Sequence, residues 1–234
     1  MAGTAAASKT ATDPARPAKA DEVGFALAPG LAALDDEVNA RTEAFRGLRT
    51  HIMARHVGEG RRSIVVCGPT PAVGCTFVAA NLAVALSQIG VNTLLIDANL
   101  RDPALDKIFR PTGPVIGLQQ CLSADDGFAE YIQQDIYPDL SVLFAGGAAP
   151  NPQELLASER FASLMSFCLR EFDMTIVDTP PANSCSDAHR VSTVAGYSLI
   201  VARKDKTLVS DVRVLADQLE NDYARVIGTV LTED

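Results

Sequence analysis

The sequence predicts an α/β fold, a doubly wound and mostly parallel sheet with helices on both faces. From Arg62 onward, short apolar segments alternate with longer segments that have helical periodicity or are rich in alanine. Strands that are apolar at every residue are buried on both faces, which is typical of parallel sheets covered by helices. Hydrophobic residues make up 47% of the 234-residue chain, enough to fill the core of one such domain.

The first part of the chain is expected to lie outside this domain. Residues 1–30 are predicted to be a disordered tail, because alanine, proline, lysine and threonine dominate and few large apolar residues are present. A helix is expected over 35–57, where apolar residues recur on one helical face: Val38, Phe45, Leu48 and Ile52. The remaining residues, 58–234, are predicted to form the α/β domain.

Within the domain, the pattern predicts strands and helices in alternation. The expected strands are 63–67 (SIVVC), 93–97 (TLLID), 140–144, 174–178 (MTIVD), 197–202 and 225–231. The expected helices are 76–88, 153–169 and 207–219. This order predicts βαβ units, which place the carboxyl ends of the strands along one edge of the sheet.

Composition excludes several classes of function. A net charge of −9 argues against a nucleic-acid surface, which needs a basic field. No apolar run reaches the roughly 18–20 residues that span a bilayer, and the N-terminus lacks the apolar region of a secretory signal. The five cysteines are scattered without a C-x-x-C pair, so we expect free thiols. These features predict a cytoplasmic protein.

The first predicted strand leads into a glycine-containing loop, CGPTPAVGCTF, and then a helix. Such a loop can bind a phosphate, because its N–H groups and the helix N-terminus carry partial positive charge. Phosphate loops usually end in Gly-Lys-Ser/Thr. Here Gly74 and Thr76 match, but Cys75 occupies the lysine position. An ordinary strand–helix turn is the alternative, and a redox-sensitive thiol at the helix N-terminus is another interpretation of Cys75.

Two aspartates follow apolar strands at the same predicted edge. Asp97 ends the second strand in LLIDANLRDP, and Asp178 ends the fourth in TIVDTPP. Because ligands bind at the carboxyl ends of parallel strands, we expect Gly74, Thr76, Asp97 and Asp178 to converge on one crevice. Carboxylates there can hold magnesium or orient a nucleophile, whereas a lone aspartate at a strand end can simply cap a helix.

Six segments in order resemble the bacterial tyrosine kinases (BY-kinases) of capsule and exopolysaccharide synthesis, a branch of the MinD/ParA-like P-loop ATPases. The resemblance covers residues 40–232. Its segments are EAFRGLRTHI (43–52), GPTPAVGCTFVAANLA (68–83), LLIDANLRDP (94–103), GLQQCL (117–122), PNPQELLAS (150–158) and TIVDTPP (175–181), after which Asp187 also matches.

The resemblance implies roles for particular residues. Those expected at the nucleotide are Gly68, Pro71, Gly74, Cys75, Thr76 and Phe77. Thr76, Asp97 and Asp178 are the expected metal ligands, and Asp97, Asn99 and Asp178 the catalytic positions, in degenerate form. Glu43, Arg46 and Arg49 match the family's E-x-x-R-x-x-R oligomerisation helix.

The chain also departs from the family pattern. Cys75 replaces the Walker lysine, and Asn99 replaces the second acid of the Asp-x-Asp pair. Thr70 stands where the wider MinD/ParA group has its signature lysine, and Thr232 where a base-contacting asparagine is expected. The four tyrosines are dispersed, so these residues contain no cluster like the family's tyrosine-rich tail. Arg101 or a lysine from a partner is a candidate replacement for the lost cation.

These departures predict a pseudokinase-like regulatory subunit that binds ATP or ADP with magnesium only weakly. The resemblance implies a partner, a transmembrane polysaccharide co-polymerase that regulates chain length, and a homo-oligomer at the inner face of the plasma membrane. An active ATP-dependent protein-tyrosine kinase is the main alternative. A positioning ATPase of the cell-division type is a third hypothesis, which the missing signature lysine and the helix from Glu43 to Arg49 disfavour.

Overall fold

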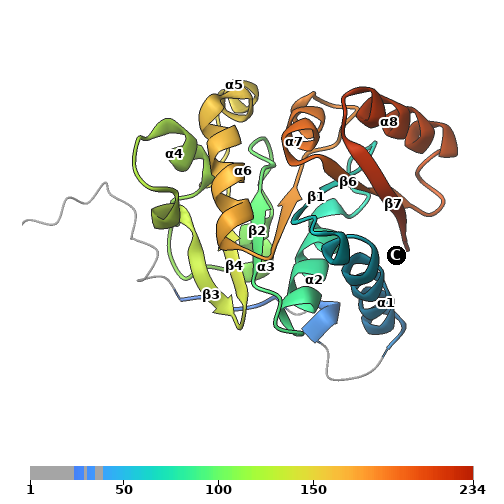
Figure 1. Ribbon diagram of the computed structural model, residues 1–234, viewed down its shortest axis with the longest axis horizontal. Coiled ribbons are helices and arrows are strands. Elements are labelled where there is room, and N and C mark those ends of the chain that lie inside the picture. The colour runs from blue at the N-terminus through green and yellow to red at the C-terminus, as the bar shows by residue number, and fades with distance from the viewer. Residues whose placement is uncertain (1–23, 29–30, 35–38, 234) are drawn as a thin grey trace, which may run out of the picture.

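The computed structural model describes residues 24–28, 31–34 and 39–233. Its centre is a seven-stranded sheet in the order β3-β4-β2-β5-β1-β6-β7 (Figure 1). All neighbouring strands pair in parallel except β3 with β4. The strands are β1 (Ser63–Cys67), β2 (Thr93–Asp97), β3 (Gln133–Tyr137), β4 (Leu140–Leu143), β5 (Met174–Asp178), β6 (Tyr197–Arg203) and β7 (Arg225–Thr232). The predicted fold class is therefore confirmed.

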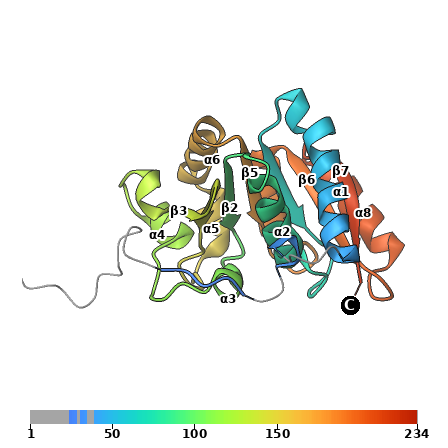
Figure 2. The same ribbon diagram turned by 90° about the horizontal axis from the view of Figure 1, so that it is seen from below.

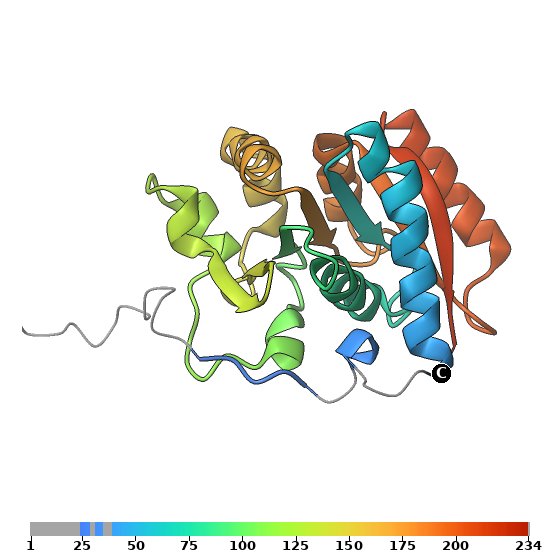
Figure 3. The ribbon, with the colours of Figure 1, turned by 60° about the horizontal axis from the view of Figure 1, so that its bottom comes forward.

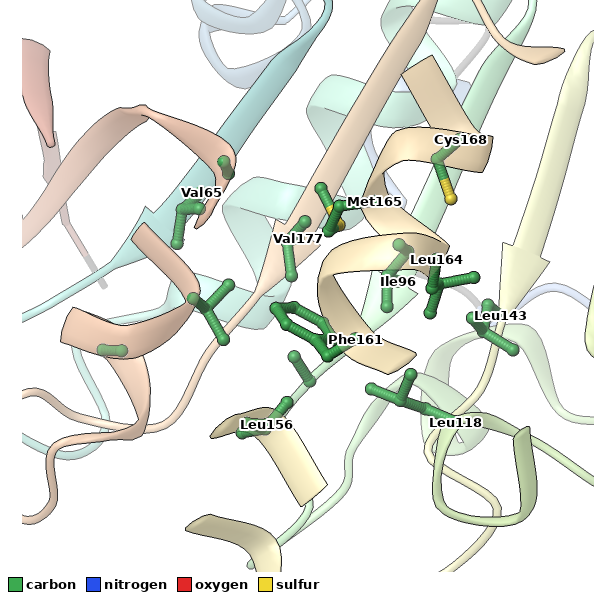
Figure 4. Packing of buried hydrophobic residues seen from close by; sticks show 14 of the residues in the cluster. Val65, Ile96, Leu118, Leu143, Leu156, Phe161, Leu164, Met165, Cys168 and Val177 are labelled. Atoms are coloured by element: carbon green, nitrogen blue, oxygen red, sulfur yellow. The ribbon is translucent and has the colours of Figure 1, made fainter. Parts of the chain in front are cut away.

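Helices cover both faces of the sheet and form two separate cores (Figure 2). One face is covered by α1 (Ala40–Arg55), α2 (Cys75–Ser87) and the short α3 (Leu105–Phe109). The other is covered by α4 (Leu118–Ser123), α5 (Pro152–Ala157), α6 (Glu159–Glu171), α7 (Asp187–Ala195) and α8 (Val209–Asn221). On this second face Phe161, Leu164 and Met165 of α6 pack against the sheet (Figure 4).

The predicted strands agree with the structure, and β1, β2 and β5 agree to the residue. The sequence missed β3, because its segment QQDIY is mostly polar and pairs antiparallel at the sheet edge. The single helix expected over 153–169 is two helices. Ser158 separates them, because its hydroxyl accepts a hydrogen bond from the N–H of Phe161 and caps the start of α6.

The three short helices α3, α4 and α7 were also missed, since each has too few residues to show a helical period. The predicted helix over 35–57 begins at Ala40 rather than Asp35. Asn39 caps it by accepting a hydrogen bond from the N–H of Thr42 at 2.9 Å. Residues 35–38, including Val38, lie outside the described residues.

The predicted disordered tail falls mostly outside the described residues. Within its range, however, residues 24–28 are placed against the domain. Phe25 forms a β-bridge with Pro111, and its ring stacks on Phe144 at 5.9 Å. These residues differ from the predicted disordered tail, because the Phe25 ring packs on Phe144 and the N–H groups of Ala26 and Ala28 donate to carbonyls of residues 108–110.

Among the described residues, no helix has the length and apolar character needed to cross a membrane. The helix α1 lies next to α2 and β7, so that the end of β7 is close to the start of α1 (Figure 3). The connection from β1 through α2 to β2 crosses one face of the sheet, and that from β6 through α8 to β7 crosses the other. Such a reversal of winding opens a crevice at the carboxyl ends of the strands.

Candidate functional site

The loop between β1 and α2 forms one wall of this crevice, which has a volume of about 620 Å³. Gly74 ends the loop with φ at +98° and is the N-cap residue of α2. Gly68 begins the loop. A Cβ atom there would collide with the side chain of Val73 and lie 2.9 Å from the carbonyl oxygen of Val201. Gly68 therefore allows the loop to fold back tightly on β1 and β6.

The crevice brings together the predicted loop and the segment after β2. Its lining includes most of the predicted nucleotide-binding residues, namely Pro71, Gly74, Cys75, Thr76 and Phe77. The opposite wall comes from residues after β2 and β5: Asn99, Arg101, Asp102, Ala104, Lys107, Ile108, Thr179, Pro180, Pro181, Ser184 and Cys185. Pro71 is exposed and Phe77 is half-buried, with its ring edge-to-face against Phe45 at 5.7 Å.

The two predicted aspartates are neighbours in the sheet and are buried, so that they do not themselves line the crevice. Asp97 and Asp178 are directly opposite each other where β2 pairs with β5, so the pairing of the strands sets their side chains next to one another. Both residues are buried. The hydroxyl of Thr76 donates a hydrogen bond to Asp178 Oδ2 at 2.6 Å. Thr76, Asp97 and Asp178 thus converge, as predicted from the sequence.

The surroundings of the two carboxyl groups differ. Asp97 accepts hydrogen bonds from the backbone N–H groups of Asn99, Ala104 and Leu105 at 3.1–3.2 Å. Burial raises the pKa of Asp97 to about 6, although these three N–H groups lower it. Burial raises the pKa of Asp178 well above its usual range, and the charge of Asp97 raises it further.

One oxygen of this pair suits a divalent cation. Asp178 Oδ1 is buried and has no hydrogen-bond partner within the described part of the chain. An unpaired buried carboxylate oxygen is costly, and a cation or its bound water would satisfy it. Magnesium prefers hard oxygen ligands, and the carboxylates of Asp97 and Asp178 with the hydroxyl of Thr76 provide such a set. The residues present therefore fit the predicted magnesium.

The thiol of Cys75 sits where a phosphate loop has lysine, on the first residue of α2. Burial raises its pKa well above the usual value, and the charge of Asp178 raises it further. These effects exceed the lowering expected at a helix N-terminus, so the thiol is neutral near pH 7. A raised pKa does not support the redox interpretation of Cys75, which relied on a lowered one.

Asn99 and Arg101 follow Asp97, and the side chain of each is hydrogen-bonded within the chain. Asn99 closes a turn, because its amide donates to the carbonyl of Asp102 at 2.7 Å and accepts from the N–H of Asp102 at 3.2 Å. Arg101 makes a bidentate pair with the buried Asp187, through Nε at 2.7 Å and Nη2 at 3.1 Å. Arg101 is thus already paired within the chain, although it also lines the crevice.

The predicted interface residues lie on α1 but do not act as one group. The exposed Glu43 and Arg46 form an ion pair with each other at 2.7 Å. Arg49 turns toward the domain and donates to the carbonyl of Ala85 on α2 at 3.2 Å. Of the three, Glu43 and Arg46 are the more accessible to a partner.

Sequence reasoning missed several contacts around the crevice. Lys107 lines it from α3, although its charge alone gave no signal. Thr232, expected near a base, instead donates from its hydroxyl to the carbonyl of Val73 at 2.8 Å. The partner of Arg101 could not be deduced either, because 86 residues separate Arg101 from Asp187. Long-range side-chain pairs of this kind leave no local pattern.

Comparison with known proteins finds clear relatives, although no family model matches the chain. CapB of Staphylococcus aureus, which bears the name of a tyrosine-protein kinase, is 31% identical over 193 residues, covering 82% of this chain and 84% of CapB. The tyrosine-protein kinase ptk of Acinetobacter johnsonii is 32% identical over 204 residues, covering 87% of this chain but only 28% of ptk. The chain thus spans about a quarter of the longer relative.

Solved structures of tyrosine kinase domains and of a MinD ATPase also resemble the chain. The kinase domain of the Escherichia coli tyrosine kinase ETK superposes with a TM-score of 0.80 at 32% identity, covering 87% of this chain and 79% of that domain. The cell-division ATPase MinD of Pyrococcus furiosus superposes with a TM-score of 0.64 at 22% identity, over 73% of this chain and 71% of MinD. The second likeness shows a shared fold alone.

Asp178→Asn is expected to raise the melting temperature at about pH 7.5, because a neutral amide replaces a buried carboxylate whose oxygen Oδ2 can still accept from Thr76. The gain should be on the order of 1–3 kcal/mol. In the folded wild type the pKa of Asp178 is raised. The stability of the wild-type protein therefore falls as pH rises above the pKa of an aspartate in the unfolded chain, roughly 4. The advantage of the variant therefore shrinks on acidification, which calorimetry across this pH range measures.

The exposed Asp173, which directly precedes β5, provides the matched control, since the hydrogen bond that its carboxylate accepts from the N–H of Asn92 can be accepted by an amide oxygen too. Asp173→Asn should change the melting temperature little at any pH. A pH-independent effect of Asp178→Asn, or an effect equal to that of Asp173→Asn, would contradict this description of the carboxylate pair.

Proposed function

Because this chain belongs to the bacterial tyrosine-protein kinase family, we propose that it is a kinase-like regulatory subunit that binds nucleotide weakly and transfers phosphate poorly or not at all. One observation carries this proposal: a neutral, half-buried thiol at Cys75 replaces the lysine of the phosphate loop. The partial retention of the site, in Thr76, Asp97 and Asp178, favours a protein that still responds to nucleotide.

Magnesium with ATP or ADP is the proposed ligand. Thr76, Asp97 and Asp178 would hold the metal, which neutralises phosphate charge when bound. The backbone N–H groups of the loop and the N-terminus of α2 would hold the phosphates. These contacts need no side-chain cation, so binding survives the loss of lysine better than catalysis does.

Loss of the lysine is expected to lower the rate of phosphoryl transfer more than the affinity for nucleotide. Removing one positioned donor or cation from such a site costs on the order of 10²–10⁵ in rate. Arg101, a candidate for a replacement, is paired with Asp187. Lys107 lines the crevice but is directed toward Asp102, with 3.9 Å between Nζ and the carboxylate. Asn99 also lacks the carboxylate that an acid at this position would supply.

The biological setting is proposed from the family. Its members resembling this chain serve capsule and exopolysaccharide synthesis, so we propose that this chain binds the cytoplasmic end of a transmembrane polysaccharide co-polymerase at the inner face of the plasma membrane. Formation of a homo-oligomer there would regulate polymer export. The exposed ion pair of Glu43 and Arg46 on α1 supports a polar interface, because arginine forks suit repeated carboxylate pairing around a symmetric ring.

Cys75→Lys is expected to tighten ATP binding about five- to 150-fold, the equivalent of one charge-assisted hydrogen bond. The new ammonium would extend from the first residue of α2 into the crevice, next to Gly74 and Thr76. Hydrolysis should stay negligible in this variant, because Asn99 still lacks a carboxylate. Calorimetry and a hydrolysis assay on wild type, Cys75→Lys, Asn99→Asp and the double variant separate the two deficits.

Two outcomes would contradict the proposal. If Cys75→Lys folds normally but leaves affinity unchanged, the loop is an ordinary strand–helix turn. If wild-type protein with magnesium and ATP accumulates phosphotyrosine, and Asp97→Ala abolishes that signal, the chain is a working tyrosine kinase.

The variant Arg46→Ala is expected to weaken assembly by roughly tenfold or more, as loss of a charged anchor residue does at an interface. Sedimentation velocity over a range of concentrations measures this change. A charge-matched control is Arg41→Ala, since Arg41 is exposed on the same helix. Should the wild type remain monomeric with and without its membrane partner, the interface proposal fails.

A further inference from the structure

Two carbonyl groups of the loop are held by side chains from outside the crevice. Arg203, at the end of β6, donates from Nη1 to the carbonyl of Ala72 at 3.0 Å. Thr232, at the end of β7, donates from its hydroxyl to the carbonyl of Val73 at 2.8 Å. The carbonyl of Ala202 lies farther from this hydroxyl, at 3.2 Å, so the single proton is best directed at Val73.

These bonds also determine where two loop N–H groups point. In a trans peptide the carbonyl and the following N–H point in opposite directions, and the described chain has no cis peptide. A carbonyl of Ala72 directed at Arg203 therefore turns the N–H of Val73 away from β6. A carbonyl of Val73 directed at Thr232 likewise turns the N–H of Gly74 away from β7.

The strand order identifies the side that these N–H groups face. The loop follows β1, which lies between β5 on one side and β6 and β7 on the other. The crevice is lined on the side of β5 and β2 by residues that follow these strands, among them Thr179 and Asn99. N–H groups that point away from β6 and β7 therefore point to the side of the loop on which the crevice lies.

The backbone conformation agrees with this arrangement. Ala72 and Gly74 both have positive φ, at +59° and +98°, on either side of Val73. When φ alternates in sign along the chain, successive N–H groups can point into one concave site, called a nest, which binds anions. A positive φ is unfavourable for alanine, so the conformation persists only where neighbouring contacts enforce it.

We propose that Thr232 and Arg203 are positioning residues of the phosphate loop, which orient the N–H groups of Val73 and Gly74 toward the phosphates of a bound nucleotide. This inference rests on the proposed nucleotide site. It assigns Thr232 a role through the loop rather than through the base. The loop keeps its anion-binding geometry by contacts from β6 and β7, independently of the residue at position 75.

Thr232→Val tests the inference, because valine has the same shape but no hydroxyl. Magnesium-ADP affinity should fall about three- to tenfold, the effect of one hydrogen bond. In the nucleotide-free protein, amide hydrogen exchange in the peptide 68–76 should become roughly tenfold faster, since the loop opens more easily. Thr232→Ser should restore both values. Thr229→Val, at an exposed position of the same strand, is the matched control and should change neither.

The two readouts separate this inference from the proposed function. If wild-type protein binds no nucleotide, the nucleotide site fails, while loop exchange alone still decides whether Thr232 holds the loop. Unchanged exchange in Thr232→Val would overturn the inference. So would faster exchange with unchanged ADP affinity, because the bond would then be structural only.

Discussion

The pairing of β2 with β5 forces two carboxyl groups together in the protein interior, and the rest of the site follows from that constraint. Asp97 and Asp178 are opposite one another in the register, and burial disfavours their charged forms. The surrounding structure offsets part of this cost. Three backbone N–H groups hold Asp97, two of them from the start of α3, and the hydroxyl of Thr76 holds one oxygen of Asp178. The remaining oxygen of Asp178 is buried and has no hydrogen-bond partner among the described residues.

This arrangement explains how a phosphate loop can lose its lysine and still keep its shape. The loop is held at Gly68 by close packing, at its carbonyls by Arg203 and Thr232, and at Thr76 by Asp178. Only the packing at Gly68 involves the side chain at position 75, because a Cβ atom at Gly68 would lie 3.0 Å from Cys75 Sγ. Cys75 is accommodated as a small neutral group, so the substitution removes a charge from the crevice and leaves the backbone in place.

Much of the fold was predictable because short segments of the sequence indicate its strands and helices. Continuous apolar runs identified β1, β2 and β5 to the residue, and the carboxyl ends of these strands brought Thr76, Asp97 and Asp178 together as expected. The parts that were missed depend on tertiary contacts. The polar strand β3 is stabilised by its antiparallel partner β4, and the helix break at Ser158 depends on one cap. The assigned catalytic, metal and interface roles remain predictions, since geometry places residues without showing chemistry.

Magnesium dependence of ATP binding tests the central claim most directly, because the carboxylate pair is the feature that survives in this site. Isothermal titration of the wild-type chain with ATP, in magnesium and in a chelator, compares the two states. We expect measurable binding at about pH 7.5 with magnesium, loss of that binding in the chelator, and weaker binding below about pH 6, where the pair takes up protons that compete with the metal. Equal affinity with and without magnesium, or no binding under either condition, would contradict the account.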